Sequence, residues 1–183
     1  MTSPYRPEFE AALRLFARIS EAMVVKGLAR PVLVGGAAVE YYSGSAISTG
    51  DFDVCTPVQP ELEAIMQAHG FIRPSGAQKS LRGWIHPELQ LGFEIVARVP
   101  MNGNVDVDHI ALVENLGKDG AFAIVSIEDL IADRMGQYAS GTAREMLGQA
   151  RTLYRLHPGL DLAYLDRRIR FESANDYGIE DLA

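Results

Sequence analysis

The segment VLVGGAAVEYYSGSAISTGDFDVC, residues 32–55, is the most informative part of the chain. It passes from an apolar run into two adjacent glycines, Gly35 and Gly36, and then through a polar stretch to Asp51 and Asp53. The pattern predicts a buried strand, a helix that begins at the glycines, and a second strand that carries the aspartates. Alternate residues of a strand lie on one face, so we expect both carboxylates to point the same way.

Two ionised carboxylates on one strand face repel each other. With an effective dielectric constant of about 20 and about 6 Å between the charges, the repulsion costs on the order of 3 kcal/mol. A bound cation, or a proton on one carboxyl, removes most of that cost. Mg²⁺ takes oxygen ligands and keeps positions for water and phosphate oxygens. Asp51 and Asp53 therefore predict a magnesium site; the alternative is a solvated strand end without a ligand.

Gly35 and Gly36 stand where the first strand is expected to become a helix. Glycine lets the backbone approach a ligand closely, and the N–H groups of a helix N-terminus can bind phosphate. GGAAVE lacks the GxGxxG spacing of a dinucleotide site, and no Gly-Lys-Ser or Gly-Lys-Thr of a P-loop follows. The glycines predict either a phosphate-binding turn of another kind or a tight turn that binds nothing.

Glu94 interrupts the strand-like run LGFEIVARV. Strand alternation predicts that Phe93 and Ile95 face a core, while Glu94 and Gly92 face the other way. One or two strands after the aspartates, Glu94 can become their neighbour in the sheet. The alternative is a solvated glutamate on a half-exposed strand.

The composition bounds the class of protein. The 183 residues, 48% of them hydrophobic, predict a soluble globular protein of one domain. No apolar run reaches the ~20 residues that span a bilayer, and the N-terminus lacks a secretory signal pattern. The single cysteine cannot form an internal disulfide and fits a cytoplasmic protein. A net charge of −7 argues against an extended nucleic-acid surface.

The rest of the chain alternates between helical and strand-like patterns. Apolar residues recur at helical spacing over residues 9–23, and Pro60 and Gly70 bracket a second helix. Ser126 and Asp129 form a capping-box pattern before a third helix, and helical spacing continues to residue 169. Outside the opening segment, strands are expected at residues 71–73, 81–86, 91–99 and 121–125.

These patterns predict an α+β (α/β) fold. We expect a mixed β-sheet core with helices packed on it over residues 1–125. A C-terminal helical region over residues 126–183 follows and packs on that core as one unit.

The combination of Gly35-Gly36, then Asp51 and Asp53, then Glu94 as a third acid resembles the nucleotidyltransferase superfamily, which has a polymerase-beta-like fold. The long gap between the glycines and the aspartates, with Thr49 two residues before the first aspartate, is similar to small prokaryotic members. That branch includes the toxin components of abortive-infection and toxin–antitoxin systems. The later VSIEDLIADRM and its amphipathic helices are similar to the helical continuation of the branch.

The resemblance implies transfer of a nucleoside monophosphate from a nucleoside triphosphate to an unknown acceptor, which is a protein, an RNA or a small molecule. Two Mg²⁺ ions would assist, and a protein partner is possible. No membrane association is expected. The implied catalytic and metal-binding residues are Asp51, Asp53 and Glu94. The implied nucleotide-binding residues are Gly35, Gly36, Ala37, Thr49, Lys79, Arg82 and Arg134.

Three positions depart from the pattern of these relatives. Ile47 stands where an arginine often precedes the threonine, Ala37 stands where serine or threonine often follows the glycines, and Glu94 replaces an aspartate. Two alternatives to an active transferase therefore stay open. One is a non-catalytic protein of the same fold that senses nucleotides or binds a partner in a toxin–antitoxin or defence system. The other is a metal-dependent phosphohydrolase.

Overall fold

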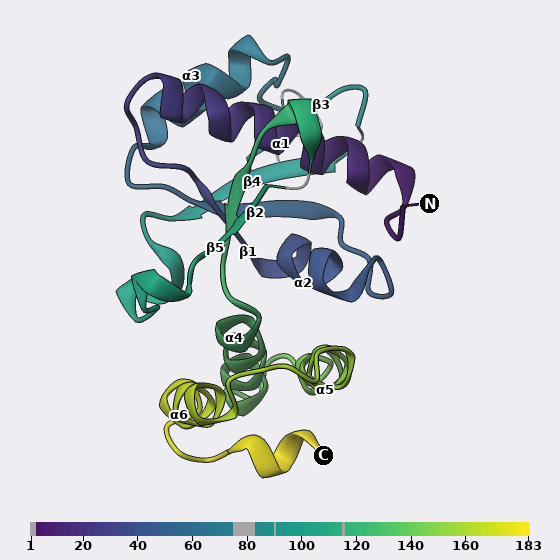
Figure 1. The fold of residues 1–183 in the computed structure, drawn as a ribbon, viewed down its shortest axis with the longest axis vertical. Coiled ribbons are helices and arrows are strands. Elements are labelled where there is room, and N and C mark those ends of the chain that lie inside the picture. The colour runs from purple at the N-terminus through teal and green to yellow at the C-terminus, as the bar shows by residue number, and fades with distance from the viewer. Residues whose placement is uncertain (1–2, 75–82, 90, 115) are drawn as a thin grey trace.

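The computed structural model describes residues 3–74, 83–89, 91–114 and 116–183. These residues form an α+β fold with a mixed six-stranded sheet and a C-terminal helical region (Figure 1). The helices are α1 (Pro7–Val25), α2 (Gly35–Ser43), α3 (Gln59–Ala68), α4 (Ile127–Ala139), α5 (Met146–Leu156) and α6 (Leu162–Glu172). The strands are β1 (Val32–Val34), β2 (Asp51–Cys55), β3 (Trp84–His86), β4 (Leu91–Ala97), β5 (Ala111–Val113) and β6 (Phe122–Ile124).

The strand order in the sheet is β3-β4-β2-β1-β6-β5. The central strand β2 runs antiparallel to β1 and parallel to β4, and β1 runs parallel to β6. The short strands β3 and β5 pair antiparallel with β4 and β6 at the two edges. This mixed order brings the start of β2 beside the end of β1, where the glycines lie.

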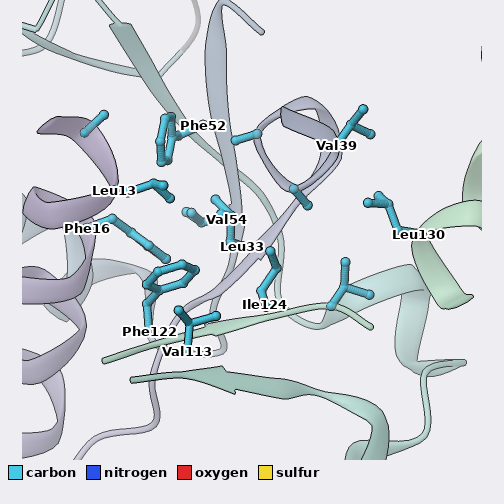
Figure 2. Packing of buried hydrophobic residues seen from close by; sticks show 14 of the residues in the cluster. Leu13, Phe16, Leu33, Val39, Phe52, Val54, Val113, Phe122, Ile124 and Leu130 are labelled. Carbon is cyan, nitrogen blue, oxygen red and sulfur yellow. The ribbon is translucent and has the colours of Figure 1, made fainter. Parts of the chain in front are cut away.

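The main core lies between one face of the sheet and α1. Phe52 of β2 and Phe93 of β4 stack with 4.5 Å between ring centroids, and Phe16 of α1 packs against both. Leu33 and Ile124 occupy the same face on the neighbouring strands and are fully buried (Figure 2). Burial of each such side chain contributes roughly 1.5–3 kcal/mol. Since alternate residues face opposite ways, this packing turns Asp51, Asp53 and Glu94 to the other face.

Local signals account for the ends of α1. Pro7 occupies the first turn, where its missing N–H costs nothing, and Glu8 and Glu10 complement the helix dipole there. Gly27, in the left-handed region with φ of 72°, ends the helix at the residue expected from the sequence. The predicted helix over residues 9–23 is therefore confirmed.

The helices α4, α5 and α6 pack together at one end of the molecule, with α1 and α3 at the other (Figure 1). The predicted cap of α4 is confirmed, since the Asp129 N–H donates to Ser126 Oγ at 3.1 Å. Asp129 also accepts from Arg168 Nε at 2.6 Å and from Tyr164 Oη at 2.8 Å, which ties α6 to α4. Within the described ranges no helix is long and apolar enough to cross a membrane.

Several strand boundaries differ from those expected. The predicted strand over residues 71–73 is wrong, because only Ile72 forms an isolated bridge, with Ile85. The expected strand at 81–86 is seen as β3 from Trp84, while residues 81 and 82 lie outside the described ranges. β4 ends at Ala97 rather than at residue 99, because a turn that starts at Pro100 follows.

The sequence pattern did not predict β5. This edge strand leaves Leu112 52% exposed, so its residues show no clear alternation of buried and exposed positions. Strand prediction depends on alternation of apolar and polar residues, and this exposed edge strand does not show that alternation.

Candidate functional site

The structure brings the three predicted acids onto one face of two neighbouring strands. Asp53 of β2 is the direct register partner of Glu94 of β4, and Asp51 is opposite Gly92. Adjacent strands lie about 4.8 Å apart, so these carboxylates are close neighbours. The expectation that Glu94 would lie beside the aspartates is met by this register.

Asp53 has the most perturbed environment of the three. Asp51 is exposed at the start of β2, whereas Asp53 is half-buried. Burial raises the pKa of Asp53, and the charges of Asp51 and Glu94 raise it further. The Gly36 backbone N–H and Arg134 act in the opposite direction and lower that pKa. A cation placed at Asp53 would be stabilised by all three carboxylates.

The glycines give room to the acids and to Thr49. A Cβ on Gly35 would lie 2.9 Å from the Cβ and Cγ of Asp53, and Gly35 has φ of +63°. A Cβ on Gly36 would lie 2.5 Å from the Thr49 hydroxyl, and one on Gly92 would collide with the Asp51 carboxylate. Close packing of the acid strand against the start of α2 is thus one physical reason for Gly35 and Gly36.

The helix α2 begins directly at Gly35, and its N-cap residue Val34 makes no side-chain cap. The N–H groups of the first turn are therefore directed toward the end of the sheet that carries Asp53. Ala37 is fully buried in the core, so its methyl group does not reach the site. The implied role of Ala37 in nucleotide binding is thereby restricted to its backbone N–H.

Thr49 is held by protein groups. Its N–H donates to Glu40 Oε2 at 2.5 Å, and its hydroxyl donates to the Asp51 carbonyl at 3.1 Å. Both interactions order the loop that leads into β2. Its side chain lies against Gly36, between the first turn of α2 and the start of β2.

Arg134 of α4 reaches the same region. It is 6% exposed, its Nη2 lies 2.9 Å from Asp133 Oδ2, and its Nη1 lies 3.2 Å from Met146 Sδ. Its Nε has no hydrogen-bond partner among the described residues. A buried donor without a partner is costly, and an anionic ligand is the natural acceptor for it.

A cavity of about 350 Å³ joins these parts. It lies between the end of β1, the face of β2 that carries Asp53, the end of β4, the start of α2 and the side of α4 from Leu130 to Gln137. Its volume is at the lower end of the range of small-molecule sites. Of the predicted residues, it is lined by Gly35, Gly36, Asp53 and Arg134.

Sequence reasoning missed three polar groups of this cavity: Asn102, Asp133 and Gln137. Cys55, which shares the strand parity of Asp53, also lines the cavity. Met101 and Asn102 form the wall that follows β4 and have positive φ angles of 45° and 55°. Left-handed backbone in non-glycine residues often occurs at functional sites, but the sequence MN contains no sign of it.

Glu94 faces a second, smaller hollow of about 120 Å³ with Arg73 and Trp84. Trp84 is 3% exposed, and the Arg73 guanidinium lies over its ring at 4.7 Å from the centroid. The proposed phosphate contacts Lys79 and Arg82 lie outside the described residues.

The donor set has the chemistry that Mg²⁺ prefers, since Asp51, Asp53 and Glu94 offer carboxylate oxygens only. Among the described residues, however, no three His, Cys, Asp or Glu side chains converge closely enough to form a ready metal site. The carboxylates fit Mg²⁺ by their chemistry and their strand register, and phosphate and water oxygens would complete the coordination.

No protein-family model matches the chain, and no curated protein matches it. The assignment of a function therefore depends on the residues and their geometry.

Proposed function

We propose that the protein is a magnesium-dependent nucleotidyltransferase. It transfers a nucleoside monophosphate from a nucleoside triphosphate to an acceptor hydroxyl and releases pyrophosphate. The observation that carries this proposal is the register of Asp53 with Glu94, with Asp51 on the same face, at the N-terminus of α2. Three acids next to the backbone N–H groups of a helix N-terminus are a suitable arrangement for a metal-bound triphosphate.

Each part of the site has a role in this proposal. Asp51, Asp53 and Glu94 would hold Mg²⁺, which when bound neutralises phosphate charge and promotes attack by the acceptor. The first N–H groups of α2 and Arg134 bind phosphate oxygens from two sides of the cavity. Glu94, which lines the smaller hollow, would with the aspartates hold the second ion and so favour deprotonation of the acceptor hydroxyl.

The decisive experiment is label transfer from the four α-³²P-labelled nucleoside triphosphates, with and without Mg²⁺. The wild-type chain is compared with Asp53→Asn. The control is Asp119→Asn, which changes a carboxylate in the turn before β6, outside the residues that line the site. We expect transfer by wild type and the control and its loss in Asp53→Asn. Release of free phosphate instead of pyrophosphate would identify a hydrolase. Absence of both transfer and nucleotide-dependent thermal stabilisation contradicts the proposal.

A second candidate is a nucleotide-binding protein without transfer activity. It is favoured by the lack of three converging metal ligands in the described ranges. Nucleotide binding that raises the melting temperature without any transfer or hydrolysis would select this candidate.

A further inference from the structure

The loop between α2 and β2, residues 44–50, packs against an ion pair between Arg6 and the buried Glu40, which are not residues of the site. Glu40 of α2 is 0% exposed, and Arg6, the N-cap residue of α1, binds it with Nε at 2.6 Å from Oε1 and Nη2 at 3.2 Å from Oε2. The two residues are 34 positions apart in the chain. A buried carboxylate is tolerated only with such compensation.

All the acceptor positions of Glu40 are occupied. Besides the two bonds from Arg6, Oε1 accepts from Ser45 Oγ at 2.9 Å and Oε2 accepts from the Thr49 N–H at 2.5 Å. A carboxylate has about four lone-pair sites, so this one is saturated by protein donors. Glu40 therefore does not bind a ligand itself. It binds the loop at Ser45, near its start, and at Thr49, near its end.

The loop is held in a conformation that it would not adopt freely. Ser45 has φ of +61°, directly after Gly44 with φ of +58°. A non-glycine residue in that region is strained, and such strain persists only where neighbouring contacts impose it. Ser45 Oγ contacts both residues of the ion pair. It donates to the Glu40 carboxylate and accepts from the backbone N–H of Arg6 at 3.1 Å.

The same network ends at the acid strand. Arg6 Nη2 donates to the Thr49 carbonyl at 2.6 Å, so the Thr49 backbone is held on both of its polar groups. The Thr49 hydroxyl then donates to the Asp51 carbonyl at 3.1 Å and lies against Gly36. A continuous chain of contacts thus runs from the Arg6–Glu40 ion pair to the first residue of β2.

We infer that Glu40, through its ion pair with Arg6, is a positioning residue that sets the place of Asp51 and Asp53 relative to the N-terminus of α2. This inference rests on the proposed function for the site that is positioned. The loop has Ile47 at the position where the resemblance described above leads us to expect an arginine. Here the Arg6 guanidinium holds the loop, and it comes from another segment of the chain.

The test compares Glu40→Gln with wild type and with Asp119→Asn. Asp119 also binds two arginines, Arg14 and Arg18, but lies at the opposite end of β6 from the site. Mn²⁺ alone is the probe, and its binding is followed by electron paramagnetic resonance. Loss of a group that orients metal ligands weakens metal binding about 10-fold or more. We expect that loss for Glu40→Gln and wild-type affinity for Asp119→Asn, although both variants lower the melting temperature.

A second variant and a second measurement keep the outcomes separate. Arg6→Lys retains the charge but loses the two-point contact, and we expect it to bind Mn²⁺ with an affinity between those of wild type and Glu40→Gln. It also serves if Glu40→Gln does not fold. Amide hydrogen exchange is measured in parallel, and we expect faster exchange confined to residues 45–53.

Equal Mn²⁺ affinity in folded Glu40→Gln and wild type would overturn the inference. If wild type itself does not bind Mn²⁺, the proposed function fails, and hydrogen exchange decides about Glu40. Faster exchange confined to the loop and β2 then supports a positioning role, and faster exchange spread evenly over the chain overturns it.

Discussion

Asp53 on β2 and Glu94 on β4 are direct register partners in a parallel strand pair, which places two acidic side chains side by side on the face opposite the aromatic core. Like charges directly opposite each other destabilise a sheet. The arrangement therefore carries an energetic cost in the free protein, which a bound cation would remove.

The first prediction concerns Asp53. Its pKa is raised above the ordinary range, first by burial and then by Asp51 and Glu94, so the ionised form destabilises the fold. A carboxyl with a raised folded-state pKa binds protons more tightly in the folded state, and its ionisation lowers stability as the pH rises through that pKa. We expect Asp53→Asn to raise the melting temperature at pH 7 without metal, and to do so more than Asp51→Asn. A lower melting temperature for Asp53→Asn would contradict this interpretation.

The second prediction separates backbone strain from collision at Gly35. Gly27 and Gly35 both have positive φ, but a Cβ on Gly27 meets nothing within 4 Å, whereas one on Gly35 meets Asp53. Gly27→Ala should cost about 1 kcal/mol of unfolding free energy from strain alone, and Gly35→Ala clearly more. Urea denaturation measures both.

The collision at Gly35 has its own control. In the double variant Gly35→Ala/Asp53→Ala the obstructing carboxylate is gone and only the Cβ of residue 53, at 2.9 Å, still obstructs, so the loss should shrink but stay above that of Gly27→Ala. If the losses of unfolding free energy from the two substitutions simply add, the Cβ of an alanine at position 35 does not collide with Asp53.

The third prediction concerns the buried contact between α4 and α6. Asp129 is fully buried and bonds to Arg168, Tyr164 and Ser126. Its removal in Asp129→Ala leaves Arg168 without its main partner and should cost about 3–5 kcal/mol of unfolding free energy. The matched surface pair Asp166–Arg170 is partly exposed, so Asp166→Ala should cost about 1 kcal/mol or less. Urea denaturation measures both losses of unfolding free energy, and similar losses in Asp129→Ala and Asp166→Ala would contradict the prediction.

The fourth prediction concerns acid stability. Hydrogen bonds from Arg14 and then Arg18 lower the pKa of Asp119. A lowered folded-state pKa contributes stability that is present above the unfolded-state value of about 3.9 and is lost as the pH falls through the folded value. The stability curves of wild type and Asp119→Asn should therefore differ at pH 7 and converge in acid. Thermal unfolding across that range tests this, and a constant difference at all pH values would argue against it.

The local parts of the fold were predictable because their signals lie within a few residues. Gly27 ends α1, Ser126 caps α4, and strand alternation puts Asp51 and Asp53 on one face. Edge and irregular segments were not predictable in this way. Ile72 forms only a bridge, and Leu112 lies in an edge strand whose exposure erases the alternation.

The sequence by itself determined which groups are available: two glycines after a strand, two aspartates on one strand face, and a glutamate on a later strand. Only the tertiary structure decided which of them meet. The register of β2 with β4 puts Glu94 beside Asp53, and the packing of α4 brings Arg134 to the same cavity. The contact of Arg6 with the Thr49 carbonyl spans 43 positions. Such contacts depend on strand order and on the packing of distant segments, because no local spacing of residues encodes them.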